Sequence, residues 1–78
     1  MEILSPAHSA FGAAIRDCRH SSGLTQEDLS GETGLHVSYV SQVERGIKNV
    51  SLTNILKLSA ALGCPVSRLM DQAEKAGL

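Results

Sequence analysis

Residues 24–46, LTQEDLSGETGLHVSYVSQVERG, constrain the fold of this chain more than any other stretch. Thr25 can cap a helix, because its hydroxyl can accept the N–H of Asp28, whose carboxylate can reach back to the Thr25 N–H. Gly34 stands where this helix should end, because glycine adopts a left-handed backbone at little cost. The pattern predicts two short helices joined by a tight turn, at about residues 25–33 and 36–45.

The second of these helices has an apolar side and a polar side. Leu35 and Val40 have the spacing of a hydrophobic staple around His36 as N-cap, and Val43 continues the apolar stripe. The residues between these positions should face outward: Val37, Ser38, Ser41 and Gln42. A helix, a glycine turn and a second helix with a polar outer face are what a DNA-reading helix-turn-helix requires.

Apolar periodicity and capping signals predict three further helices. The first covers residues 7–21, where apolar residues recur at i, i+3, i+4 and i+7. Ser51 can cap the next helix, and Gly63 should end it. Pro65 suits the start of the last helix, at about residues 65–76, because a missing N–H costs nothing there. The sequence therefore predicts an all-α fold, a compact five-helix bundle with a central helix-turn-helix.

Length, charge and cysteine content limit the alternatives. Seventy-eight residues suffice for a single domain, 1–78, and a net charge of −1 argues against a non-specific basic nucleic-acid coat. No apolar run approaches the roughly 18 residues of a membrane helix, and the N-terminus lacks the features of a signal peptide. Cys18 and Cys64 have no metal-like spacing, and we expect two reduced, partly buried thiols. We expect no cofactor, no metal site and no small-molecule ligand.

The chain resembles the Cro-type helix-turn-helix family of transcriptional regulators, also called the xenobiotic-response-element type. This family includes phage repressors, small bacterial regulators and the controller proteins of restriction–modification systems. The resemblance covers about residues 9–72 and rests on GLTQEDL, on Gly34, on YVSQVERG and on NVSLTNILKLSAALG. VERG followed by NVSLTNILKL is most similar to the controllers. The resemblance implies a lambda-repressor-like DNA-binding domain in a cytoplasmic, bacterial or phage-encoded regulator.

The resemblance also implies which residues meet DNA. Gln26 matches a glutamine that binds a phosphate, which suits the free N–H groups and dipole of a helix N-terminus. Gln42 can pair with adenine and Val37 can press on a thymine methyl. The positions that match base-reading residues are Val37, Ser38 and Gln42, with Tyr39 reaching backbone or base. The positions that match the phosphate-tracking loop are Arg45, Lys48 and Asn49.

Some of these residues have a structural alternative. Arg19 and Glu44 match a pair that joins the first and third helices in relatives, and we favour that ion pair over a DNA contact by Arg19. Tyr39 could simply pack its ring and expose its hydroxyl. Ser30 and Gly31 are small where the two motif helices should cross, which indicates a packing role. Glycine inside a helix lowers helix stability by about 1 kcal/mol relative to alanine.

The distribution of cations favours a homodimer. No lysine or arginine lies between residues 20 and 44, which leaves Arg16, Arg45 and Lys48 as cationic phosphate contacts. So few cations would give a weak monomer, because phosphate neutralisation supplies most non-specific affinity. We expect a homodimer on a palindromic operator, reading the major groove of two half-sites roughly 34 Å apart. Leu69 and Met70 of the last helix are the expected dimerisation residues.

Other classes of function have less support. The histidines are scattered and no nucleophile–base pair or phosphate loop is visible, so we expect no enzymatic activity. The main alternative is an antitoxin or adaptor module whose principal partner is another protein.

Overall fold

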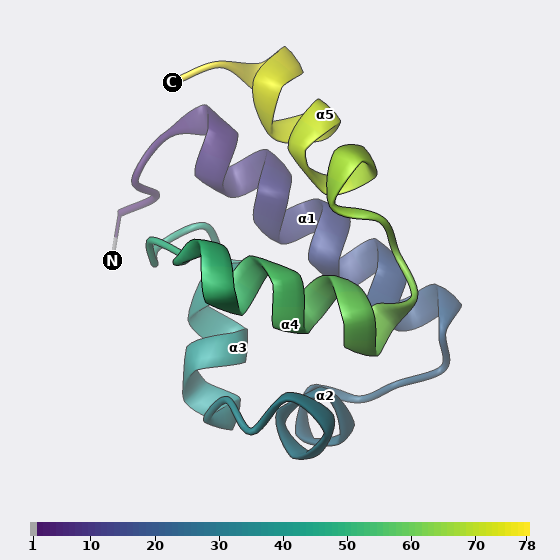
Figure 1. Ribbon diagram of the computed structural model, residues 1–78. Helices are drawn as coiled ribbons and strands as arrows, with labels where there is room; N and C mark the ends of the chain where they lie inside the picture. Colours follow the sequence, from purple (N-terminus) through teal and green to yellow (C-terminus); the bar gives the residue numbers. More distant parts are fainter. Residues whose placement is uncertain (1) are drawn as a thin grey trace.

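The computed structural model describes residues 2–78, and five helices make up most of this part of the chain (Figure 1). The helices are α1 (Pro6–Ser21), α2 (Gln26–Thr33), α3 (Val37–Glu44), α4 (Leu52–Leu62) and α5 (Val66–Ala76). Residues 2–78 contain no strand. The predicted all-α architecture is confirmed, and the helix bounds agree with the predicted ranges to within about a residue.

Local side-chain caps explain where the helices begin. The Asp28 N–H donates to Thr25 Oγ1 at 3.0 Å, and the Thr25 N–H donates to Asp28 Oδ2 at 2.9 Å. The hydrogen bond from the Thr25 N–H stabilises the Asp28 carboxylate and holds the pKa of that carboxyl below its usual range. Ser51 Oγ caps α4 by accepting the Asn54 N–H at 3.1 Å. Gly34 ends α2 with a φ of 75°, the left-handed conformation that glycine adopts most easily.

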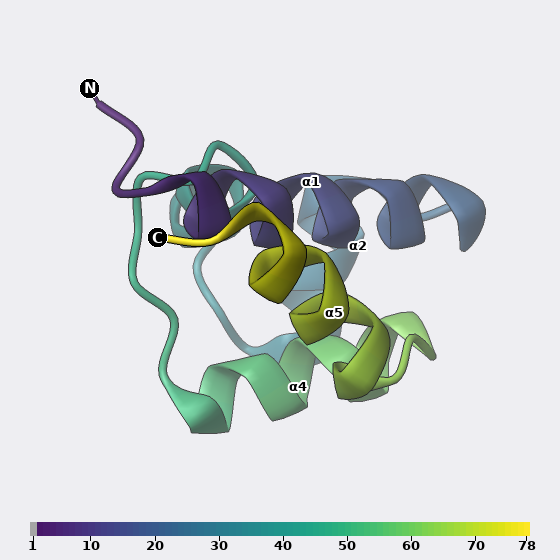
Figure 2. The ribbon, with the colours of Figure 1, turned by 90° about the horizontal axis from the view of Figure 1, so that it is seen from above.

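Helix α1 organises the bundle, since it lies against α3, α4 and α5, while α2 lies against α3 and α4 (Figures 1 and 2). One side chain or more from each helix contributes to the apolar core. The fully buried residues are Ile15, Leu29, Val40, Val43, Leu58 and Leu69.

The position of Leu69 corrects one expectation. Leu69 is 0% exposed and belongs to the core of its own chain, whereas its neighbour Met70 is 42% exposed. Successive residues of a helix point about 100° apart, so Met70 can face solvent while Leu69 faces the core. Met70 is therefore the member of the pair that is available to a partner.

A second correction concerns the glycine at the closest helix crossing. A Cβ on Gly12 would lie 2.6 Å from the carbonyl oxygen of Glu44, whereas a Cβ on Gly31 would meet nothing within 4 Å. The tight crossing is between α1 and α3, and the expected packing role of Gly31 is wrong.

The two cysteines, which the sequence predicts as separate reduced thiols, lie next to each other in the structure. Cys18 in the last turn of α1 and Cys64 between α4 and α5 are placed to pair as a disulfide, with Cα atoms 6.5 Å apart. Both residues are buried in the core. Their partnership depends on packing across 46 residues of sequence, which spacing alone does not reveal.

Candidate nucleic-acid interface

Helix α3 carries the residues that are expected to read bases. Its buried side consists of Val40, Val43 and Glu44, so the opposite side faces away from the core. Ser38 is exposed, and Gln42, one turn further on, is half-buried on the same face. The structure thus places Ser38 and Gln42 together on the outer side of the second motif helix.

His36, the N-cap of α3, orients Ser38 in a way that the sequence did not indicate. Its Nδ1 accepts the Ser38 N–H at 3.3 Å and lies 2.9 Å from Ser38 Oγ. A ring nitrogen that accepts a backbone N–H carries no proton, so the Ser38 hydroxyl donates its hydrogen to the same atom. The Ser38 oxygen remains an acceptor, which suits the amino groups of adenine and cytosine in the major groove.

Glu44 fixes α3 on α1 through a buried ion pair. Arg19 Nε donates to Glu44 Oε2 at 2.7 Å, and Arg19 Nη2 donates to Oε1 at 2.9 Å. The hydrogen bonds to Glu44 raise the pKa of Arg19. Arg19 Nη1 also donates to the carbonyl of Leu24 at 3.0 Å. The ion pair expected between Arg19 and Glu44 is present, and Arg19 is too buried to contact DNA.

Two expected phosphate ligands meet at the same residue. Gln26 Nε2 donates to Glu44 Oε1 at 3.1 Å, and Arg16 Nη2 donates to the Glu44 carbonyl at 3.1 Å. The Arg16 side chain is 46% exposed, so part of its guanidinium faces solvent. Glu44 therefore holds one amide and two guanidinium groups at the point where α1, α2 and α3 meet.

The α3–α4 loop carries the remaining expected phosphate ligands. All three of these residues are exposed: Arg45, Lys48 and Asn49. Tyr39 connects this loop to the neighbouring helices. Its hydroxyl donates to the Asn49 carbonyl at 3.5 Å and accepts from Asn54 Nδ2 at 3.1 Å. Its ring packs against the core. These contacts favour the structural alternative for Tyr39, a link between α3, the loop and α4.

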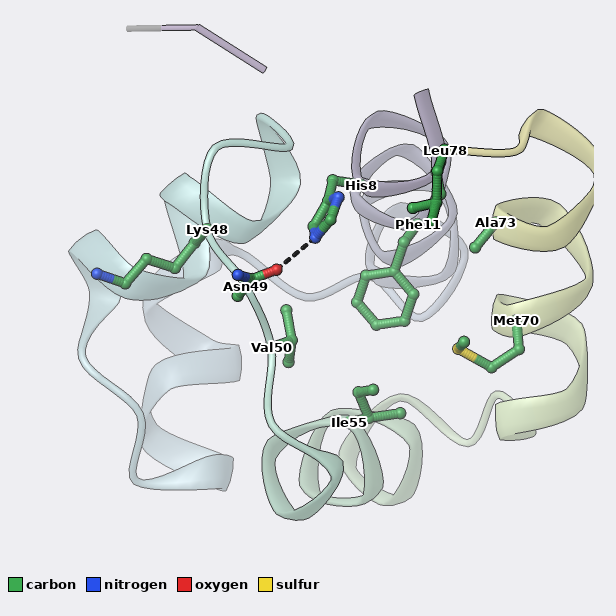
Figure 3. A pocket seen from close by; sticks show the side chains of 10 residues that line it. His8, Phe11, Lys48, Asn49, Val50, Ile55, Met70, Ala73 and Leu78 are labelled. Carbon is green, nitrogen blue, oxygen red and sulfur yellow. Dashed lines mark hydrogen bonds between the residues drawn. The ribbon is translucent and has the colours of Figure 1, made fainter. Parts of the chain in front are cut away.

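An apolar groove of about 220 Å³ adjoins the loop, between α1, α4 and α5 (Figure 3). Its apolar lining comprises Ala7, Phe11, Val50, Ile55, Met70, Ala73 and Leu78. His8, which the sequence did not single out, stands at the loop side of the groove, and its Nε2 hydrogen-bonds Asn49 Oδ1. No local pattern could have revealed this pair, because the two residues are 41 positions apart.

Two other kinds of feature are absent from residues 2–78. No group of three or more His, Cys, Asp or Glu side chains in this range is arranged to hold a metal ion. Within the same residues, no helix has both the length and the apolar character needed to cross a membrane.

Comparison with known proteins identifies the family. Residues 15–69 match the helix-turn-helix protein family. Over 62 residues the chain is 48% identical to the control protein C.BamHI of Bacillus amyloliquefaciens, covering 78% of this chain and 76% of that protein. It is 38% identical over 66 residues to the control protein C.MunI of a Mycoplasma species, covering 83% and 89%. The crystal structure of the restriction–modification controller protein C.AhdI from Aeromonas hydrophila matches with a TM-score of 0.75 and 49% identity, over 78% of this chain and 92% of that chain. The chain therefore belongs to the helix-turn-helix family of transcriptional regulators, among the control proteins of restriction–modification systems.

Proposed function

We propose that this regulator acts as a homodimer in the cytoplasm of a bacterium, binds a palindromic operator in double-stranded DNA, and controls a restriction–modification operon. The observation that carries the proposal is the pairing of α2 with α3, in which Glu44 anchors α3 from behind and leaves Ser38 and Gln42 on its outer face. A helix held in this way can enter the major groove without an added entropic cost of ordering.

Base reading is assigned to the outer face of α3. Gln42 can make a bidentate contact to adenine, and Ser38, with its hydroxyl hydrogen donated to His36, offers an acceptor to a base amino group. Val37, half-buried at the start of the helix, can contact a thymine methyl.

Phosphate contacts are assigned to groups on both sides of this helix. Arg16 and Gln26 gather at Glu44, where α2 begins, and the free N–H groups there favour an anion. Arg45, Lys48 and Asn49 extend the contact along the α3–α4 loop. These contacts position the helix on the duplex and carry no base preference.

Dimerisation is assigned to exposed apolar side chains of α4 and α5. Leu52 and Leu56, one turn apart on α4, are 69% and 53% exposed, and Met70 on α5 is 42% exposed. A two-fold interface would cover these side chains and bring two reading helices to one face of the duplex.

A selection from random duplex DNA tests the proposal and requires no known operator sequence. Wild-type protein should enrich a two-fold-symmetric sequence, and the spacing of its halves should correspond to about one helical turn. The Gln42→Ala variant, selected in parallel, should lose the preference at one position of each half-site. A wild-type protein that enriches no sequence would instead favour the adaptor or antitoxin alternative, with the apolar groove as the place to look for a protein partner.

A further inference from the structure

His8 links the first turn of α1 to the loop that is assigned to DNA phosphates. Its imidazole is held from both sides. Ser5 Oγ lies 2.6 Å from Nδ1. On the other side, Asn49 Oδ1 hydrogen-bonds Nε2 (Figure 3). Ser5 Oγ also accepts the His8 backbone N–H at 3.2 Å, as the N-cap of α1. For a neutral imidazole, one arrangement of hydrogens satisfies all of these groups: the Ser5 hydroxyl donates to Nδ1, and Nε2–H donates to Asn49.

This contact fixes which end of the Asn49 amide faces outward. With Oδ1 turned toward His8, Nδ2 lies on the opposite side of the side chain (Figure 3). Asn49 is exposed, and within residues 2–78 its Nδ2 donates to no acceptor. An asparagine without such a restraint could present either its oxygen or its nitrogen, and only the nitrogen can donate to a phosphate.

The backbone of the same loop is also docked on the N-terminal segment. The Leu4 N–H donates to the Gly46 carbonyl at 2.9 Å. Gly46 has a φ of 75°, and a Cβ there would lie 2.8 Å from Ser9 Cα, so the loop rests directly on the first turn of α1. The loop is therefore held at Gly46 and again at Asn49, on either side of the exposed Lys48.

We propose that His8 is a positioning residue for DNA binding, which turns the Asn49 amide so that Nδ2 donates to a phosphate oxygen beside the Lys48 ammonium. The benefit is pre-organisation, because the amide needs no reorientation when DNA arrives. This inference rests on the proposed DNA-binding function. It lies beyond the segment that matches the helix-turn-helix family, since Ser5 and His8 precede residue 15.

A double-mutant cycle on operator affinity tests the proposal, with the selected duplex as the probe. Asn49→Ala should weaken binding about tenfold or more, the value of one hydrogen bond to a charged group. His8→Ala should weaken it by a similar or smaller factor, and the double variant should bind no more weakly than Asn49→Ala. His8→Gln should restore most of the affinity, because its amide nitrogen can take the place of Nε2–H. Losses that multiply in the double variant, or a His8→Ala protein with wild-type affinity, would overturn the proposal.

A purely structural role for His8 predicts a different pattern. Asn49→Asp keeps an oxygen for His8 but removes the outward donor, so it should preserve the melting temperature and weaken DNA binding more than Asn49→Ala. The Asn49 side-chain NH₂ resonances of the free protein should shift in His8→Ala and return in His8→Gln. If His8→Ala lowers affinity only by lowering the folded fraction, the melting curve will account for the whole loss and the proposal fails. A wild-type protein that binds no DNA would overturn the proposed function itself.

Discussion

Arg19 and Glu44 form a two-pronged hydrogen bond across the α1–α3 contact, with N···O distances of 2.7 and 2.9 Å. Both residues are buried, so each charge depends on the other for compensation. The carboxylate also receives the Gln26 amide, which ties α2 to the same point. The orientation of α3 relative to the rest of the bundle thus depends on this pair.

Removing one partner of this pair should be costly. We expect Arg19→Ala to lower the free energy of unfolding by about 3–5 kcal/mol, because it leaves the Glu44 carboxylate buried and uncompensated. Arg19→Met combined with Glu44→Leu should recover much of the loss, since no charge then remains buried. Urea unfolding of the three proteins measures both effects. A loss below about 1 kcal/mol in Arg19→Ala would show that the pair stabilises the fold no more than a surface ion pair does.

Two glycine-to-alanine substitutions in helices should have opposite effects. Gly12→Ala places a methyl group against the carbonyls of Val43 and Glu44, and should cost about 1–3 kcal/mol or more through overpacking. Gly31→Ala meets open space inside α2 and should stabilise by about 0.5–1 kcal/mol, because alanine loses less backbone entropy. Denaturant unfolding of both variants provides a matched comparison. Equal effects of the two substitutions would contradict the assignment of the close crossing to α1 and α3.

A disulfide between Cys18 and Cys64 would make stability depend on reducing agent. Cys18 and Cys64 are 46 positions apart, and releasing the loop that they close should lower the free energy of unfolding by about 4 kcal/mol in the chain-entropy treatment. Unfolding curves with and without a phosphine reductant measure the difference, and Cys64→Ala serves as a control that should not respond to reductant. Titration of two free thiols in the unreduced, unfolded protein would rule out the bond.

Formation of the homodimer should depend on the side chains of Met70 and Leu56, and Leu69 should not take part in the interface. Leu56→Glu and Met70→Glu should each leave a folded monomer with much weaker operator binding, because both side chains are exposed in the single chain. Leu69→Glu should instead unfold the protein, since it buries an unpaired charge. Sedimentation equilibrium and a melting curve on each variant separate these outcomes. A wild-type protein that is monomeric at tens of micromolar and still binds a palindrome tightly would exclude the dimer.

Short-range features of the fold could be predicted from sequence, and contacts between distant segments could not. The Thr25–Asp28 cap and the glycine turn at Gly34 depend on residues within one helical turn, so the local sequence is sufficient to predict them. The Arg19–Glu44 pair is predicted only through the family resemblance, because nothing local links the two residues. The choice between Leu69 and Met70 depends on the rotation of α5 about its axis, which neighbouring helices fix.

The missed contacts share one physical cause. Three contacts form only when α1 is packed against other elements: His8 with Asn49, Cys18 with Cys64, and Gly12 with α3. Composition and periodicity say which side chains a helix buries, but they do not say which partner a side chain meets. The assignments of Gln42, Ser38 and the loop cations to DNA remain predictions.

We propose that the outer face of α3 reads bases, and substitution of Gln42 tests this proposal. Operator and random duplex of the same length should be titrated with wild type and with Gln42→Ala, at one salt concentration. The substitution should cost about 1–3 kcal/mol on the operator and change random-duplex affinity little, because a base contact is lost while phosphate contacts stay. Lys48→Ala provides the matched control: it should weaken both duplexes by a similar factor and make the salt slope shallower by about one unit. Equal losses on operator and random DNA in Gln42→Ala would contradict base reading by α3.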